Sequence, residues 1–207
     1  MRSFLFLITL VVSKFTFSQF TPLSIGQKAP LSDLQMTSTT GEMLSLKKMN
    51  QEGLIVIFTS NTCPFVIGFN DGTFGGWENS YNSIFEKAKA HSIDVVLVNS
   101  NEAKREGGES LSDMTKRKSD KGFMMSYVLD KNSELANAFG AKTTPHIFFF
   151  DRNLNLIYTG SIDNSFEDKR KTDVPYLMNA IDAYSKGKKI KTKSTAPKGC
   201  SIKRMKN

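Results

Sequence analysis

The chain has 207 residues, which is enough for one domain with a sizeable core and too few for two domains of ordinary size. Its formal charge of +8 comes from one end: residues 185–207 hold nine lysines and arginines and no acidic residue, and subtracting nine from +8 leaves −1 for residues 1–184. This distribution argues against a nucleic-acid-binding domain. We interpret residues 185–207 as a solvated basic tail, which allows at most weak contact with an anionic membrane surface.

The N-terminus has the features of a secretory signal peptide. Arg2 precedes an apolar stretch at residues 4–12, which is shorter than the roughly 20 residues of a membrane span. Small residues follow at Thr16 and Ser18, as near a cleavage site. The sequence therefore predicts a signal peptide at residues 1–18 and an exported protein, periplasmic or secreted. A buried first helix or an uncleaved anchor is the alternative.

The next part of the chain alternates between strand and helix patterns. Two short apolar runs around Gly41 predict a hairpin. A continuous apolar run at residues 54–58 predicts a strand buried on both faces, and residues 93–98 predict a second one. Between them, apolar side chains recur at helical spacing over residues 77–91. Strand, helix and strand in this order indicate a crossover unit of an α/β domain.

The second half of the chain supplies further helices and a second hairpin. Residues 111–121 and 133–139 predict helices, residues 146–158 predict the hairpin, and a last helix begins near residue 174. We therefore expect one α/β domain over residues 19–184, with a central mixed sheet flanked by helices. The N-terminal hairpin comes before the main part of this domain, and the basic extension at residues 185–207 follows the domain.

Two features of the sequence point to thiol chemistry. Cys63 follows the first buried strand and opens the segment Cys-Pro-Phe-Val, and Thr144-Pro145 precedes another apolar run. Together they resemble the redox site of the thioredoxin superfamily, where a cysteine at a strand-to-helix turn faces a cis-proline. The resemblance implies a thioredoxin fold and a reactive Cys63, because helix N-termini favour the thiolate form of a cysteine.

The chain also departs from the familiar patterns of that superfamily. Val66 replaces the second cysteine of Cys-x-x-Cys, and Ile57 stands where thioredoxins have a buried acid. Peroxiredoxins have the pattern Pro-x-x-x-(Thr/Ser)-x-x-Cys before their reactive cysteine, and an arginine near the catalytic pocket. Here Ser60 fits the hydroxyl position of that pattern, but Val56 replaces its proline. No arginine precedes the strand after Pro145. The whole chain best resembles the peroxiredoxin-like, redoxin-domain branch, in residues 61–66, 98–101, 127–130, 144–148, 160–163 and 199–203.

The resemblance implies a thiol oxidoreductase that uses Cys63 on disulfides or peroxides, without a cofactor and with an external thiol as reductant. The residues that we expect to shape its site are Ser60, Thr62, Pro64, Thr144 and Pro145. Cys200 is the only other cysteine, and an exported chain with two cysteines invites a disulfide, so Cys200 is the candidate resolving partner of Cys63. The alternative is a tail cysteine that pairs with nothing or with another chain. The spacings of the cysteines and histidines do not predict a metal site.

Several alternatives stay open at the level of sequence. The domain is either an active oxidoreductase, a redox-inactive binding module, or a structural domain cross-linked by a permanent disulfide between Cys63 and Cys200. His146 either polarises Cys63 or packs in the core.

A glycine-rich insertion at residues 68–76 interrupts the helix after Cys63. Its aromatic side chains, with Trp77 just beyond it, either line a substrate groove or pack onto the domain.

Overall fold

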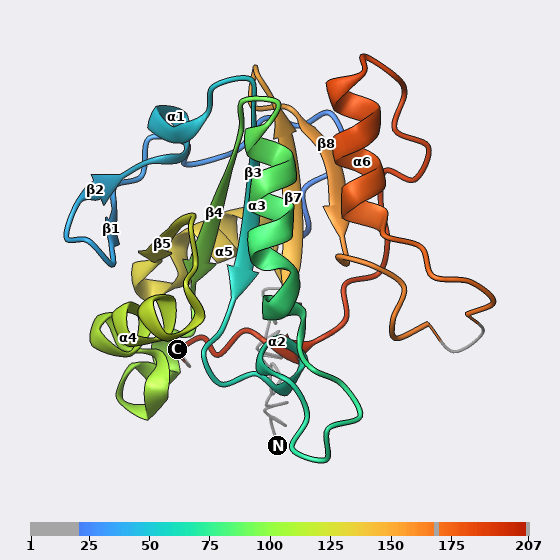
Figure 1. Cartoon of the computed structure of the whole chain (residues 1–207). Coiled ribbons are helices and arrows are strands. Elements are labelled where there is room, and N and C mark those ends of the chain that lie inside the picture. Colours follow the sequence, from blue (N-terminus) through green and yellow to red (C-terminus); the bar gives the residue numbers. More distant parts are fainter. Residues whose placement is uncertain (1–20, 168–169, 206–207) are drawn as a thin grey trace, which may run out of the picture.

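The structure, a computed structural model, describes residues 21–167 and 170–205. Its centre is a seven-stranded sheet with the strand order β2-β1-β5-β4-β3-β7-β8 (Figure 1). The three central strands β3, β4 and β5 are parallel, and the other neighbouring pairs are antiparallel, so the sheet is mixed. The strands of this sheet are β1 (Met36–Ser38), β2 (Met43–Leu44), β3 (Gly53–Thr59), β4 (Ile93–Asn99), β5 (Ser126–Leu129), β7 (His146–Asp151) and β8 (Leu156–Gly160).

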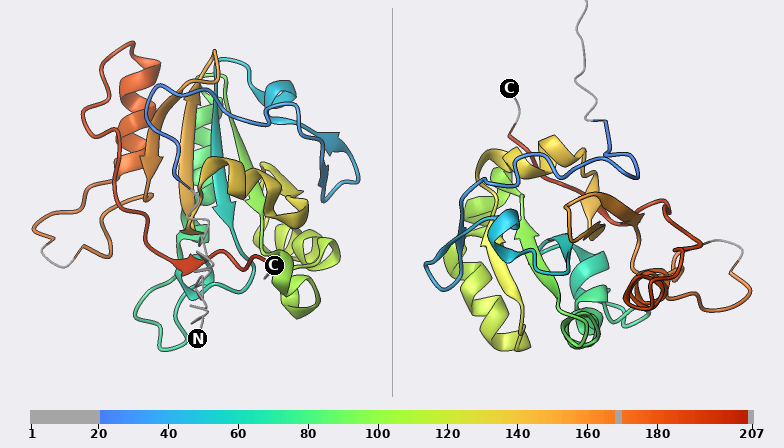
Figure 2. Two further views of the ribbon diagram at one scale, coloured as in Figure 1. Left: turned by 180° about the vertical axis from the view of Figure 1, so that it is seen from behind. Right: turned by 90° about the horizontal axis from the view of Figure 1, so that it is seen from above.

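Helices cover both faces of this sheet. Helices α3 and α6 lie against one face, and α5 lies against the other (Figures 1 and 2). The helices are α1 (Leu46–Met49), α2 (Pro64–Ile67), α3 (Tyr81–Lys89), α4 (Leu111–Lys121), α5 (Glu134–Phe139) and α6 (Tyr176–Ser185). Shorter helical turns are Trp77–Ser80, Glu102–Lys104, Arg105–Glu109 and Lys131–Ser133.

Strand β3 divides the core into two halves, because successive side chains of a strand point to opposite faces. Ile55 and Ile57 belong to the cluster under α3 and α6, together with Tyr81. Val56 and Phe58 belong to the cluster on the α5 side. All seven residues of β3 are buried. This burial explains why the sequence shows a continuous apolar run here rather than alternation.

The elements predicted from the sequence are present with small differences at their ends. The strand predicted at residues 54–58 extends by one residue at each end, and α4 has the predicted bounds. Helix α4 is well delimited because Ser110 and Asp113 form a capping box at its start and Gly122 ends it in the left-handed conformation. The predicted N-terminal hairpin is not a separate unit: β1 pairs with β5 and so extends the central sheet.

The segment after α6 packs on the domain at a few points, while its described lysines are exposed as expected for a basic tail. It crosses the molecule from α6 to the region below α5 (Figure 2). A second, two-stranded sheet joins its β9 (Cys200–Ser201) to β6 (Thr143–Thr144). Ile190 and Ile202 are buried, and Arg204 donates to the Ala141 carbonyl oxygen at 2.6 Å. Two buried apolar residues and the backbone pairing therefore hold this segment on the domain.

The predicted signal peptide at residues 1–18 lies outside the described residues. Within the part of the chain that is described, no helix combines the length and the apolar character needed to span a bilayer.

Candidate functional site

Cys63 lies where β3 gives way to α2, at the carboxyl end of the central strands. It is the residue just before α2, and Pro64 occupies the first position of that single-turn helix, where a missing backbone N–H costs nothing. The Cys63 side chain is buried, with 3% of its surface exposed. Its thiol donates to the carbonyl oxygen of Thr144 at 3.0 Å. The peptide bond between Thr144 and Pro145 is cis.

Cys200 reaches the same place from the other end of the chain. Strand β9 is antiparallel to β6, in a register that sets Cys200 opposite Thr144, whose carbonyl oxygen accepts from Cys63. Gly199 makes this approach possible, because a Cβ there would collide with the Thr144 carbonyl group and because its φ of 152° is one that other residues rarely adopt. Both cysteines are free thiols.

A small hollow joins the two thiols. Its volume is about 90 Å³, and the side chains that line it include most of the residues singled out from the sequence. The lining residues are Ser60, Thr62, Cys63, Asn101, Thr144, Cys200, Ser201 and Lys203. Asn101 and Lys203 were not predicted. Pro64 is exposed beside this group and starts α2.

The surroundings of Cys200 favour its protonated form. Burial, a hydrogen bond to Cys63 and the charge of Cys63 raise the pKa of the Cys200 thiol to about 11. At neutral pH, Cys200 therefore keeps its proton and sits as a hydrogen-bond donor beside Cys63.

Glu109 is the main site residue that the sequence did not reveal. It is fully buried at the end of the turn Arg105–Glu109, behind the loop that leads to Cys63. Its carboxylate accepts hydrogen bonds from Ser60, from the Asn61 backbone and from Thr62. The sequence carries no signal for this role, because a single glutamate after two glycines looks like a solvated loop residue.

Arg105 lies behind the Glu109 carboxylate and compensates its charge indirectly. Its guanidinium donates to the Asn99 side-chain oxygen at 2.7 Å and to the Glu109 backbone oxygen at 2.9 Å, while the Asn99 amide donates to the Glu109 carboxylate. Tyr127 completes the group by donating to Asn61 at 2.9 Å. Burial, followed by the charge of Glu109, raises the pKa of Tyr127 well above its usual value. The tyrosine is therefore a neutral donor.

His146 is a core residue and does not polarise Cys63. Its ring packs on Phe148 with centroids 4.5 Å apart, and its Nδ1 accepts from the Lys142 backbone at 3.2 Å. Burial lowers the pKa of His146 to about 3. The imidazole is neutral at physiological pH and offers no positive charge to a thiolate.

The glycine-rich insertion folds back on α2. The chain forms one helical turn after Cys63, then a loop, and resumes helical structure at Trp77, as predicted. Gly76 has a φ of 89° and lies directly on the backbone of α2, where a Cβ would collide with Val66. Trp77 is buried and donates to Asp163 at 3.0 Å, so it packs the domain rather than lining a groove.

The aromatic side chains of the insertion do not line the thiol hollow. Phe69 and Phe74 contact Phe166 and line a separate hollow of about 720 Å³ between the insertion and residues 163–166 and 170–175. The residues that line it do not include Cys63 or Cys200. The structure therefore does not bring this aromatic group to the thiols.

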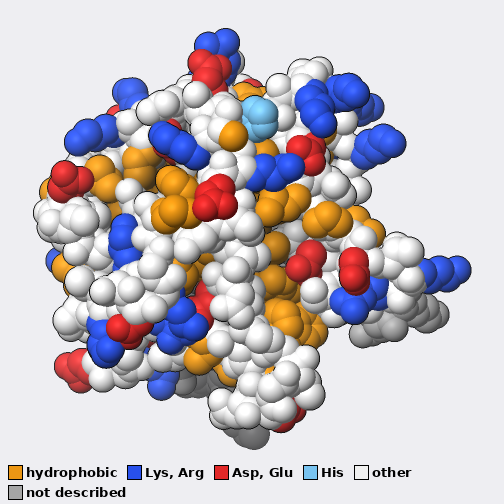
Figure 3. Space-filling view, viewed as in Figure 1, with side chains coloured by type: hydrophobic (Ala, Val, Ile, Leu, Met, Phe, Trp, Pro, Cys, Tyr) orange, Lys and Arg blue, Asp and Glu red, His pale blue; other side chains and the backbone are white. Residues whose placement is uncertain are grey.

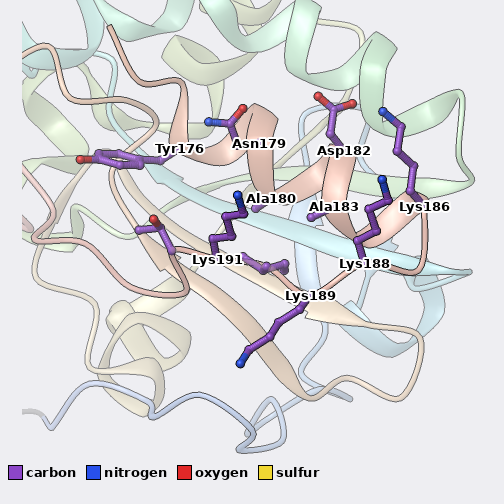
Figure 4. Close-up of a pocket in the computed structure, with 11 residues that line it drawn as sticks. Tyr176, Asn179, Ala180, Asp182, Ala183, Lys186, Lys188, Lys189 and Lys191 are labelled. Carbon is purple, nitrogen blue, oxygen red and sulfur yellow. The ribbon is translucent and has the colours of Figure 1, made fainter. Parts of the chain in front are cut away.

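A third hollow, of about 450 Å³, lies between α6 and residues 186–192 (Figure 4). Four lysines surround it, and basic side chains gather over this part of the surface in the space-filling view (Figure 3). The four are Lys186, Lys188, Lys189 and Lys191. These side chains are exposed, and the residues that line the hollow contain no thiol. Across residues 21–167 and 170–205, no three His, Cys, Asp or Glu side chains gather as metal ligands would.

The Redoxin family matches residues 24–175. The chain belongs to the Redoxin family. The match ends before Cys200, so the placement of the second thiol comes from the structure alone. No curated protein matches the chain.

Solved structures support the fold. A hypothetical protein from Sinorhizobium meliloti 1021 is 26% identical with a TM-score of 0.75, covering 90% of this chain and 98% of its own. The thioredoxin domain of a thiol-disulfide oxidoreductase from Bacteroides vulgatus is 15% identical, with a TM-score of 0.55 and coverage of 79% and 99%. Peroxiredoxin Q from Xanthomonas campestris is 15% identical, with a TM-score of 0.53 and coverage of 80% and 96%. The chain has a thioredoxin fold.

Proposed function

We propose that this Redoxin-family protein is an exported thiol oxidoreductase in which Cys63 attacks a peroxide or a disulfide and Cys200 resolves the product. The observation that carries the proposal is the hollow of about 90 Å³ shared by the two thiols. Cys63 has no local partner, because Val66 occupies the place of the second cysteine. Strand β9 supplies the missing sulfur from the far end of the chain.

With a peroxide, the reaction is a two-electron oxidation of the thiol pair. The Cys63 thiolate attacks the distal oxygen of ROOH, the O–O bond breaks, and with one proton the products are a sulfenic acid on Cys63 and ROH. The Cys200 sulfur then attacks the sulfenic sulfur, the S–O bond breaks, and water leaves with the Cys200 proton. An external dithiol returns both sulfurs to thiols and becomes a disulfide itself.

With a disulfide substrate, the same two sulfurs act by exchange. Cys63 attacks one sulfur of R–S–S–R′ and releases R′S⁻, which leaves a mixed disulfide on Cys63. The Cys200 thiol loses its proton as its sulfur attacks the Cys63 sulfur, RSH leaves with that proton, and the Cys63–Cys200 disulfide remains. In both cases Cys200 enters as a protonated thiol, consistent with its raised pKa.

The packing of the C-terminal segment favours an enzyme over a peptide-binding module. A peptide that binds beside a sheet edge uses the backbone N–H and C=O groups of that edge. Here the backbone of β6 is already paired with β9, and the Lys142 carbonyl oxygen accepts from the Ile202 N–H at 3.1 Å. A permanent structural disulfide between Cys63 and Cys200 would differ from the proposed catalytic disulfide in one respect: it would not open and close with the redox state.

The experiment is thiol titration combined with peptide mapping. We expect two free thiols after mild reduction, none after one equivalent of peroxide, and a cross-linked pair of peptides containing Cys63 and Cys200. Cys63→Ser should abolish peroxide consumption, and Cys200→Ser should stop at a single oxidised thiol. A disulfide that mild dithiols do not open, or oxidation that never links the two peptides, would contradict the proposed cycle.

Export and the partners belong to the same proposal. The support for export is the signal-like sequence at residues 1–18, and the external partners are a thiol reductant and the oxidised substrate. Weak contact with an anionic membrane surface rests on the exposed lysines of residues 186–203. Mass spectrometry of the exported protein tests export, because residues 1–18 should be absent from it.

A further inference from the structure

Glu109 is a buried carboxylate whose partners are all hydrogen-bond donors. It is 0% exposed, and its two oxygens accept five hydrogen bonds. The donors are the hydroxyls of Ser60 and Thr62, the backbone N–H of Asn61, and the side-chain amides of Asn99 and Asn101. Burying a carboxylate is costly unless its oxygens are satisfied. This concentration of donors therefore indicates a site built around Glu109.

One group of these bonds reaches the loop before Cys63. The Ser60 hydroxyl donates to Glu109 and accepts the backbone N–H groups of Thr62 and Cys63, each at 3.1 Å. The Thr62 hydroxyl donates to the same carboxylate at 2.7 Å. The orientation of both hydroxyls is thus fixed by Glu109, and Ser60 passes this constraint to the backbone of Cys63 itself.

A second group of bonds reaches the segment that carries Cys200. The Asn101 amide donates to Glu109 at 3.2 Å, and its carbonyl oxygen accepts the backbone N–H of Lys203 at 2.9 Å. The Lys203 carbonyl oxygen in turn accepts from the Ala103 N–H at 2.9 Å. Lys203 follows Cys200 by three residues and lies two residues beyond the end of β9. The Asn101 side chain therefore bridges Glu109 to the C-terminal segment.

We propose that Glu109 is the positioning residue of the two-thiol site. Through Ser60 it holds the Cys63 loop, and through Asn101 it holds the Cys200 segment, so that one carboxylate sets how the two sulfurs approach each other. The proposal rests on the proposed function of Cys63 and Cys200. None of the hydrogen bonds described for Glu109 involves a thiol, so it acts through other residues and is not itself a catalytic group.

The test separates the two groups of bonds by measuring two rates. Alkylation of Cys63 by iodoacetamide, in a Cys200→Ser background, reports on the Cys63 loop. Closure of the disulfide after one equivalent of hydrogen peroxide, in the chain with both cysteines, reports on both segments. The variants are Glu109→Gln, Ser60→Ala and Asn101→Ala. Glutamine keeps the size of the side chain but turns one oxygen into a donor that faces other donors.

Glu78→Gln is the matched control. Glu78 is also buried, with 3% exposed, but it pairs with Arg117 and Lys121 and has no described hydrogen bond to the Cys63 loop. We expect Glu109→Gln to slow both rates by about tenfold or more, which corresponds to ~1.4 kcal/mol. Ser60→Ala should slow alkylation, Asn101→Ala should slow closure alone, and Glu78→Gln should change neither.

A double variant distinguishes positioning from general destabilisation. If Glu109 acts through Ser60, then Glu109→Gln combined with Ser60→Ala should alkylate no more slowly than Glu109→Gln alone. Additive effects, unchanged rates in Glu109→Gln, or an equal loss in Glu78→Gln would overturn the proposal. If Glu109→Gln does not fold, the two alanine variants decide. Slower alkylation in Ser60→Ala, together with slower closure and unchanged alkylation in Asn101→Ala, supports the proposal, and any other pattern overturns it.

The wild-type rates separate this inference from the proposed function. A wild-type protein whose Cys63 does not alkylate and whose disulfide does not close overturns both. A reactive wild type with an equally reactive Glu109→Gln overturns the role of Glu109 alone.

Discussion

Closing the Cys63–Cys200 disulfide should stabilise the domain strongly. The two cysteines are 137 positions apart (200 minus 63). A cross-link over a loop of this length lowers the entropy of the unfolded chain by an amount equivalent to about 5 kcal/mol at 25 °C. Because β9 is already paired with β6 while both thiols are free, forming the bond requires little rearrangement of the native fold. Most of this stabilisation should therefore appear in the measured free energy of unfolding.

Urea unfolding of the reduced and oxidised protein measures this difference. With a urea m-value of about 2–3 kcal/mol/M, the midpoint should rise by roughly 2 M on oxidation. Cys200→Ser is the control and should unfold at the same urea concentration with and without oxidant. If the oxidised protein is shown by mapping to carry the Cys63–Cys200 link and yet unfolds at the reduced midpoint, the docked geometry does not suit a disulfide and the reasoning fails.

Two further predictions follow from the shifted pKa values. The Cys63→Ser variant removes two of the causes that raise the pKa of Cys200, the hydrogen bond to Cys63 and the charge of Cys63. The midpoint of the Cys200 alkylation rate against pH should therefore fall clearly below about 11. An unchanged midpoint would contradict the pairing of the thiols. Since the pKa of His146 is about 3 in the fold and about 6.5 in unfolded chains, protons bind the unfolded state preferentially between these values. Stability should therefore fall by up to ~1.4 kcal/mol per pH unit as the pH drops through this window. His146→Gln should lack this part of the slope in urea unfolding, whereas His91→Gln should keep it.

The buried strands and the first thiol were readable from the sequence because local patterns encode them. The apolar run of β3 identifies a strand that is covered on both faces, and Cys63 follows it at the point where parallel strands end. Thr144 and Pro145 stand before another apolar run, but the expectation that they lie beside Cys63 rests on the resemblance to the thioredoxin superfamily. The strands and the Cys63 turn themselves depend on residues that are close together along the chain.

The rest of the site depends on contacts that no local pattern encodes. The burial of Glu109 depends on five donors from two separate stretches of chain, residues 60–62 and 99–101, that converge on it. Ile190 and Ile202 are single apolar residues among lysines, so the average composition of their segment suggested a solvated tail. Strand β9 has two residues, too few for a periodic pattern. These are cases in which tertiary packing overrides local composition.

The two-thiol site is assembled from stretches of chain that lie far apart in the sequence. The Cys63 loop, the turn that ends at Glu109, strand β6 and strand β9 must all be in place before the hollow exists. Contacts of such long sequence separation carry a large loop-closure cost and tend to slow folding. The unit of β3, α3 and β4 contains only one of the two thiols. Paired thiol chemistry is therefore a property of the completely folded chain, and a substitution that loosens only residues 199–203 can abolish it while the central sheet remains intact.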